Sequence, residues 1–149
     1  MVRVQEADFD VGVELAALRR EHPQVGALVS FVGVVRELND AAGVSEMLLE
    51  HYPGMTEKAL AAIVDEARRR WTIIDATVIH RVGRLLPTDQ IVLVAVSGGH
   101  RGEAFAACEF IMDYLKTRAP FWKRELTADG ARWVAARAVD EQAAERWQG

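Results

Sequence analysis

In the second half of the chain, a long segment with the apolar spacing of a helix lies between two segments with the pattern of strands. Its apolar residues recur at the spacing of one helix face, and the helix is expected to begin near Arg101 and to end before Pro120. The members of this face are Ala104, Phe105, Cys108, Ile111, Met112 and Leu115. The apolar run Ile91 to Ser97 precedes the helix and FWKREL at 121–126 follows it. Strand, long helix and strand in direct succession indicate a mixed α and β fold.

The rest of the chain alternates between the same two patterns. Helical spacing predicts a first helix capped by Asp10 and a second near Thr56 to Trp71. Further strands are expected at 25–36, 45–52, 72–80 and 131–137, with a loop at 37–44, turns at 53–54, 87–89 and 128–130, and a charged tail that can be helical. The strand from Val25 to Arg36 is apolar on both alternating faces, so we expect it to be covered on both sides. No repeat or linker divides the chain, which predicts a single α+β domain over residues 1–149.

Composition and charge narrow the classes of function. The chain has 149 residues, of which 50% are hydrophobic, enough for one core, and its net charge is −4. Residues 100–137 hold seven Lys and Arg against five acidic residues, whereas the remainder is acidic. An acidic protein with one cationic stretch suits a small anionic ligand better than nucleic acid. No run is long and apolar enough to span a membrane, and no secretory signal is evident, so we expect a cytoplasmic protein.

Cysteine and histidine give no pattern typical of a metal site. The four histidines, at positions 22, 51, 80 and 100, lack HExxH spacing, and the single Cys108 has no partner. Cys108 lies within the apolar face of its helix, so we interpret it as a small core side chain. His51 follows Glu50, which allows acid and base chemistry, but a strand end before the turn at 53–54 is the favoured interpretation.

The segment SGGHRGE at 97–103 has the features of an anion site. A strand that ends in glycines and leads into a helix exposes backbone N–H groups at the positive end of the helix dipole. His100 and Arg101 add cationic donors at the same point. The alternative is that the two side chains pair with a carboxylate.

The segment MDYLKTRAPFWKRE at 112–125 places two lysines on either side of a helix-to-strand corner. Lys116 falls at the border of the apolar face, one turn after Met112, so we expect its ammonium group to be partly buried. Strand alternation separates Phe121, Lys123 and Glu125 from Trp122 and Arg124. Two neighbouring lysines can depress each other's pKa, which would suit a nucleophile or a proton donor. A solvated basic corner is the alternative.

Four segments together resemble one family. FVGVVR at 31–36, LEHYPGMTEKAL at 49–60, HRVG at 80–83 and HRGEAFAACEFIMDYLKTRAPFWKRE at 100–125 resemble, in this order, the large catalytic subunit of molybdopterin synthase. The resemblance implies an α/β hammerhead fold with an additional antiparallel sheet. It also implies a sulfurtransferase of molybdenum cofactor biosynthesis, which converts cyclic pyranopterin monophosphate into molybdopterin by adding the two dithiolene sulfurs.

The same resemblance implies partners and site residues. Sulfur would arrive as a thiocarboxylate on the Gly-Gly tail of a small ubiquitin-like subunit, and two large subunits would form the homodimeric centre of a heterotetramer. No metal or other cofactor is implied, because molybdenum enters at a later step. Lys116 and Lys123 correspond to the catalytic pair. The substrate-binding positions would also include Arg36, His100, Arg101, Arg124, Glu125, Val34 and Val35, followed by Phe31, Met112 and Arg137. Relatives often carry a polar residue at position 34, so Val34 is expected to contribute a backbone contact only.

One spacing predicts a site shared between two copies of the chain. Arg101 and Lys116 lie 15 residues apart in the expected helix, which separates them by roughly 22 Å along its axis. Both can reach one small phosphate only if they come from protomers related by a two-fold axis. A binding module that has lost turnover and a different enzyme acting on phosphoanions are the alternatives to a synthase.

Overall fold

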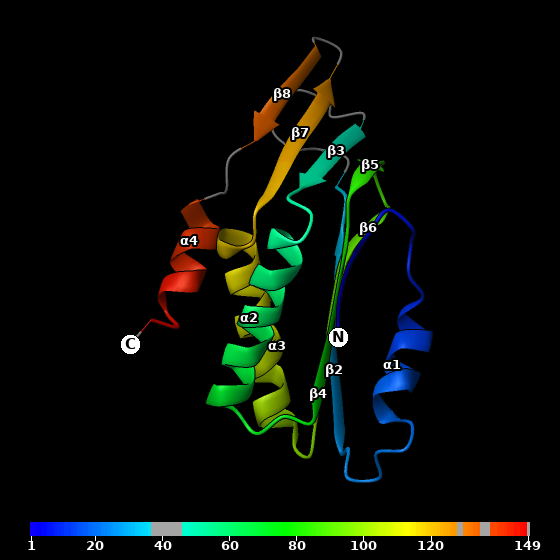
Figure 1. Ribbon diagram of the computed structural model, residues 1–149, viewed down its shortest axis with the longest axis vertical. Coiled ribbons are helices and arrows are strands. Elements are labelled where there is room, and N and C mark those ends of the chain that lie inside the picture. Colours follow the sequence, from blue (N-terminus) through cyan, green and yellow to red (C-terminus); the bar gives the residue numbers. More distant parts are fainter. Residues whose placement is uncertain (37–45, 128–129, 135–137, 149) are drawn as a thin grey trace.

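The protein has two four-stranded β-sheets in which most strand pairs are antiparallel. Helices cover both faces of the sheet that contains β1, β2, β4 and β6 (Figure 1). The computed structural model describes residues 1–36, 46–127, 130–134 and 138–148, and it describes residues 124–127, 130–134, 138 and 139 by their backbone alone. The elements in chain order are β1 (Val2–Gln5), α1 (Val11–Arg19), β2 (Ala27–Val34), β3 (Glu46–His51), α2 (Met55–Arg70), β4 (Asp75–Arg81), β5 (Gly83–Leu85), β6 (Gln90–Gly98), α3 (Arg101–Arg118), β7 (Phe121–Thr127), β8 (Gly130–Val134) and α4 (Ala138–Glu145). The predicted α+β class with an additional antiparallel sheet is confirmed.

The first sheet is the centre of the body of the molecule. Its strand order is β1-β4-β6-β2, with β1 parallel to β4 and the other pairs antiparallel. α1 covers one face, whereas α2 and α3 cover the other (Figure 1). On β4, Ile79 packs in the cluster that includes Phe9 and Leu18 beside α1, whereas Val78 packs in the cluster of α2 and α3. β4 and β6 are therefore buried on both faces, and the continuous apolar run of β6 is typical of a strand in this position.

The expectation that segment 25–36 would be covered on both sides holds for part of β2 and is wrong for the rest. Ala27 and Val29 pack on the cluster of α2 and α3, and Leu28 and Val32 pack on the cluster beside α1. β2 spans only Ala27–Val34, lies at the edge of the sheet and pairs with β6 alone. Phe31 is 42% exposed and Val34 is 46% exposed. Apolar residues on both faces of a strand are thus compatible with an exposed edge.

The second sheet closes one end of the body. Its order is β5-β3-β7-β8, and every pair is antiparallel. β5 was not predicted. It has only three residues, which is too short for a periodic pattern, and its first residue, Gly83, has a positive φ. A third apolar cluster joins the two sheets, formed by Val35, Met47, Leu49, Val82 and Leu85, with Phe121 packed against it.

The long helix α3 is confirmed, with one correction to its apolar face. Phe105 was placed in that face, but it is 60% exposed. The buried arc instead extends to the other side and takes in Ala107, Phe110 and Tyr114, because α2 and α4 pack on α3 from that side. The charged tail forms α4, and Trp147 Nε1 after it donates to Asp113 Oδ2 at 2.6 Å.

Candidate functional site

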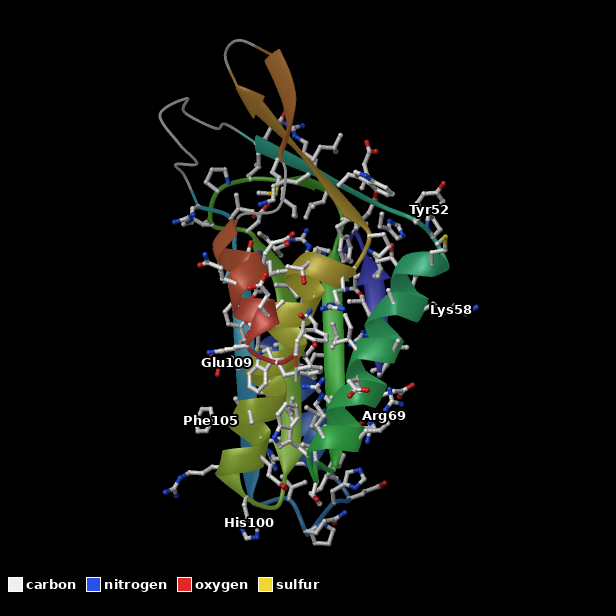
Figure 2. All side chains as sticks on the ribbon, turned by 90° about the vertical axis from the view of Figure 1, so that its left-hand side faces the viewer. Tyr52, Lys58, Arg69, His100, Phe105 and Glu109 are labelled. Carbon is white, nitrogen blue, oxygen red and sulfur yellow. The ribbon has the colours of Figure 1, made fainter. Side chains whose placement is uncertain are left out.

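The topology decides which predicted site residues lie together. β2 is antiparallel to β6, and α3 runs back along β6 after the short connection at 99–100, so β2 and α3 end at the same end of the body. Arg36, just after β2, and Lys116, in the last turn of α3, therefore lie near the second sheet. His100 and Arg101 lie at the opposite end, as the label of His100 shows in Figure 2.

The start of α3 has the local structure expected of an anion site. His100 is the N-cap residue, and its side chain makes no capping hydrogen bond. His100 and Arg101 are both exposed, and neither pairs with a carboxylate among the residues that the structure describes. The neighbouring turn is tight, because Gly26 N donates to Gly98 O at 2.9 Å and a Cβ at Gly26 would lie 2.3 Å from Gly99 O. The first-turn N–H groups and the side chains of His100 and Arg101 thus remain available to an anion.

Lys116 is exposed, which corrects the expectation of a partly buried ammonium group. Met112, one turn earlier, is 8% exposed and marks the margin of the buried arc of α3. Lys116 lies just beyond this margin, where the helix is about to end before Pro120. The long side chain is therefore accessible to a ligand.

Lys123 lies on the inner face of the second sheet. In the pairing of β3 with β7, Lys123 is opposite Leu49, and directly opposed residues point to the same face. Leu49 is 5% exposed and belongs to the cluster between the two sheets, so the face of Lys123 is turned toward the first sheet. Trp122 is 42% exposed and packs on Tyr52 with ring centroids 5.4 Å apart. The predicted alternation is confirmed for residues 121–123.

A buried threonine holds the corner between the two lysines. Thr56 is fully buried in the first turn of α2, and its Oγ1 donates to Pro120 O at 3.0 Å. The same oxygen accepts a hydrogen bond from Tyr52 N at 3.0 Å. Thr56 therefore ties the connection after β3 to the connection after α3.

A buried histidine lies beside the same corner. His80 is 6% exposed, and its ring stacks on Phe121 with centroids 3.8 Å apart and an interplanar angle of 21°. Burial lowers the pKa of His80 to about 4, and the positive charges of Lys116 and Lys123 act in the same direction. Both lysines are thus close enough to this imidazole to influence its charge.

His51 ends β3, as the favoured interpretation of its sequence position requires. It is half-buried, lies opposite Phe121 and adds to the depression of the pKa of His80. The structure therefore also places His51 beside the lysine corner.

The residues at the end of β2 differ in accessibility. Val35 is 3% exposed, its N–H donates to Asp89 O at 2.9 Å, and its carbonyl oxygen accepts from Thr88 N at 2.9 Å. Val34 and Arg36 are exposed, so these two residues present the surface at this point.

Some predicted residues lie outside the described part of the chain or are described only in their backbone. Arg137 and the loop at 37–44 lie outside it, and the side chains of Arg124 and Glu125 are not described. Among the described residues, no group of three or more His, Cys, Asp or Glu is placed to hold a metal ion. No helix in the described ranges combines the length and apolar character that crossing a membrane needs.

Cys108 is a core residue, as predicted. Its Sγ lies 3.6 Å from Val94 O, and burial raises the pKa of the thiol to about 11. A protonated, buried thiol is a poor nucleophile at neutral pH.

Sequence reasoning missed His80 and Thr56 as neighbours of the lysines. Strand alternation could have placed His80 on the same face of β4 as Ala76 and Val78, the face that α2 and α3 cover. No local signal relates either residue to the corner at Pro120, because that proximity depends on how the second sheet packs.

Comparison with known proteins identifies relatives over the whole chain. The model of the MoaE protein family matches residues 4–118. The molybdopterin synthase catalytic subunit of Ralstonia nicotianae is 73% identical over 146 residues, which cover 98% of this chain and 83% of that protein. The solved molybdopterin biosynthesis MoaE protein from Burkholderia ambifaria MC40-6 is 60% identical, with a TM-score of 0.87 and coverage of 100% and 98%. A chain from a complex of subunits 1 and 2 of molybdopterin-converting factor from Helicobacter pylori 26695 is 20% identical, with a TM-score of 0.75 and 91% coverage of both chains, and shares the fold.

Proposed function

The chain belongs to the MoaE family of molybdopterin synthase catalytic subunits, and from this premise we propose how its residues carry out the sulfur transfer of molybdenum cofactor biosynthesis. The substrate is cyclic pyranopterin monophosphate and the product is the dithiolene of molybdopterin. The sulfur arrives as a thiocarboxylate on the C-terminal Gly-Gly tail of a small ubiquitin-like subunit. A complex of two subunits in the H. pylori relative supports such a partner.

The observation that carries this proposal is the corner at Pro120. Lys116 precedes it and is exposed, whereas Lys123 follows it on the inner face of the second sheet. The charge of each lysine lowers the pKa of one imidazole, His80, so both lysines lie within electrostatic range of that ring. Arg36 lies at the same end of the body, which adds a guanidinium group suited to phosphate.

The chemistry assigns different tasks to these cations. Attack by the sulfur forms a C–S bond on the pterin side chain and breaks a C–O bond there. The oxygen atom that leaves must be protonated. Lys116 and Lys123 are the proposed donors, because they flank the region where the anionic substrate would lie. Arg36, His100 and Arg101 are proposed to hold the phosphate while its ring opens. Because the sulfur comes from the partner, the reaction needs no reactive thiol in this chain, and the buried Cys108 is compatible with that.

We propose that the complete site uses two protomers. Arg101 and Lys116 lie in one uninterrupted helix, about 22 Å apart along the axis and only about 60° apart around it. A second copy that lays its α3 antiparallel against this side would bring its own Arg101 to Lys116. Phe105 is 60% exposed and lies about 40° around the axis from Arg101, so this side offers apolar surface to a partner copy. We propose that this homodimer forms the centre of a heterotetramer with the small subunits and works in the cytoplasm.

Reconstitution tests the proposed activity. The purified chain is incubated with thiocarboxylated small subunit and cyclic pyranopterin monophosphate, and dithiolene formation is measured. We expect product only when the small subunit carries the thiocarboxylate, so the matched control is the same subunit with an unmodified C-terminal carboxylate. Complex formation without dithiolene would indicate a binding module, and would refute the synthase.

A further inference from the structure

His80 is placed to connect the core of the first sheet to the second sheet. It lies near the end of β4, opposite Val92 of β6, on the face that α2 and α3 cover. Its ring meets Phe121, the first residue of β7, in a near-parallel stack with centroids 3.8 Å apart. The stack is therefore a direct contact between β4 and the strand that carries Lys123.

The hydrogen bonding of His80 defines its neutral form. Nδ1 lies 2.8 Å from Arg81 O, and because a carbonyl oxygen only accepts, Nδ1 carries the proton. In the neutral ring Nε2 is then an acceptor. Burial is the main cause that lowers the pKa of this imidazole to about 4, and the charges of Lys116 on α3, Lys123 on β7 and His51 on β3 add to it. The ring is thus uncharged at neutral pH, although basic groups from three elements act on it electrostatically.

The position of Phe121 determines the position of Lys123. The two residues are separated by one residue in β7 and share the inner face of the sheet. Pro120, directly before Phe121, is held through its carbonyl oxygen by Thr56. The beginning of β7 is therefore fixed by a hydrogen bond at Pro120 and by an aromatic stack at Phe121.

We propose that His80 is a positioning residue for Lys123: its neutral ring is the platform on which Phe121 stacks, and this stack sets where the Lys123 ammonium group lies. The proposal rests on the proposed function, in which Lys123 acts on the substrate. His80 itself donates and accepts no proton in the reaction. An imidazolium at this place would be buried beside Lys116, Lys123 and His51, so the platform requires the neutral ring.

Three variants test the platform in the intact complex with thiocarboxylated small subunit. His80→Ala removes the ring, and we expect kcat to fall on the order of tenfold to a hundredfold, with KM for the pterin changed less than about threefold. His80→Phe restores an aromatic ring of similar size without a titratable group, and we expect kcat within about threefold of the wild type. Ile79→Ala is the matched control, because Ile79 is the fully buried neighbour on the opposite face of β4. It should lower the thermal midpoint while kcat stays within about twofold, since its cavity lies beside α1.

A second set of measurements separates positioning from proton transfer and from loss of folding. His80→Phe should keep both limbs of the pH profile of kcat/KM, and loss of a limb between pH 5 and 8 would make His80 an acid or base and overturn the proposal. Equal losses of kcat in His80→Ala and Ile79→Ala would overturn it as well. If His80→Ala does not fold, Phe121→Leu breaks the same stack from a half-buried position and should give the same fall in kcat, whereas unchanged kcat would contradict the platform.

One readout is independent of turnover. The chain has three lysines, Lys58, Lys116 and Lys123, so ¹³C-methylated lysine resonances can be assigned by single Lys→Arg variants. We expect the Lys123 resonance to move in His80→Ala, to return in His80→Phe and to stay in place in Ile79→Ala. A Lys123 resonance that stays in place in His80→Ala would overturn the proposed positioning role of His80, even if Lys123 is catalytic. Conversely, full activity of Lys123→Ala would refute the proposed function and leave the structural role of the stack standing.

Discussion

The hydroxyl group of Thr56 donates a hydrogen bond to the carbonyl oxygen of Pro120, 64 residues further along the chain, at a distance of 3.0 Å. Pro120 lies between Lys116 and Lys123 in the sequence, so this bond joins α2 to the connection from which β7 starts. Because Thr56 also accepts from Tyr52 N, one buried hydroxyl satisfies two backbone groups.

Replacing this hydroxyl should destabilise the protein. Thr56→Val keeps the shape of the side chain but leaves Tyr52 N and Pro120 O without this hydrogen-bond partner. The loss should lower the free energy of unfolding by about 1–3 kcal/mol. Thr56→Ser keeps the hydroxyl and loses one buried methyl group, about 1 kcal/mol. Urea unfolding measures both. A Thr56→Val protein as stable as the wild type would show that the hydrogen bonds contribute nothing beyond packing.

Lys116→Ala should nearly abolish turnover and leave the fold intact. The side chain is exposed, so its removal creates no cavity, whereas loss of a general acid typically lowers the rate about 10²- to 10⁴-fold. The matched control is Lys58→Ala, which removes the exposed lysine on α2 that Figure 2 labels. Dithiolene formation and thermal unfolding are measured for both. Near-normal activity of Lys116→Ala would remove this lysine from the mechanism.

Elements with a long periodic pattern were predictable from the sequence, and their exposed margins were not. α3 begins and ends where its apolar spacing, Gly98-Gly99 and Pro120 indicated. Phe105 was misplaced because it lies at the edge of the buried arc, where one residue of shift in the packing of a helix decides between core and solvent. The exposure of Phe31 and Val34 likewise depends on β2 being an edge strand, which the pairing order decides.

The components of the candidate site were predictable from the resemblance, whereas their support was not. Lys116 and Lys123 were identified on either side of Pro120, and the strand register explains why Lys123 faces inward. The contacts of His80 with Phe121 and of Thr56 with Pro120 join segments far apart in sequence. Such contacts arise only when the second sheet closes on the end of the first, and no local spacing encodes them.

The neutral His80 should make the protein sensitive to acid. Its pKa is about 4 in the folded state against 6.5 as the ordinary value, so below pH 6.5 the unfolded chain binds the proton first. The stabilisation is fully present above pH 6.5 and is lost progressively down to pH 4, by up to about 3 kcal/mol. The unfolding free energies of the wild type and of His80→Phe, measured between pH 4 and 7.5, isolate the contribution of His80 to this pH dependence. Parallel curves would mean that His80 does not titrate differently in the two states.

Cys108 should produce the opposite dependence at high pH. Burial raises the pKa of its thiol from the ordinary 9.0 to about 11, so the folded state keeps the proton that the unfolded chain releases. The stabilisation is present below pH 9 and is lost between pH 9 and 11, by up to about 2–3 kcal/mol. Cys108→Ala should lack this slope and keep normal dithiolene formation. A large loss of activity in Cys108→Ala at unchanged stability would assign the thiol a chemical role and contradict its place in the core.

Two inactive chains should restore activity to each other if the site is shared. In a mixed dimer of Arg101→Ala and Lys116→Ala, one of the two sites combines both defects and the other combines two intact contributions. Random exchange makes half of the dimers mixed, so the mixture should reach about a quarter of wild-type activity, although each parent is nearly inactive. Subunit exchange is verified by native mass spectrometry with one chain isotopically labelled. If Arg101 and Lys116 served the same site within one protomer, every chain in the mixture would carry a defect, and the mixture would stay as inactive as its parents.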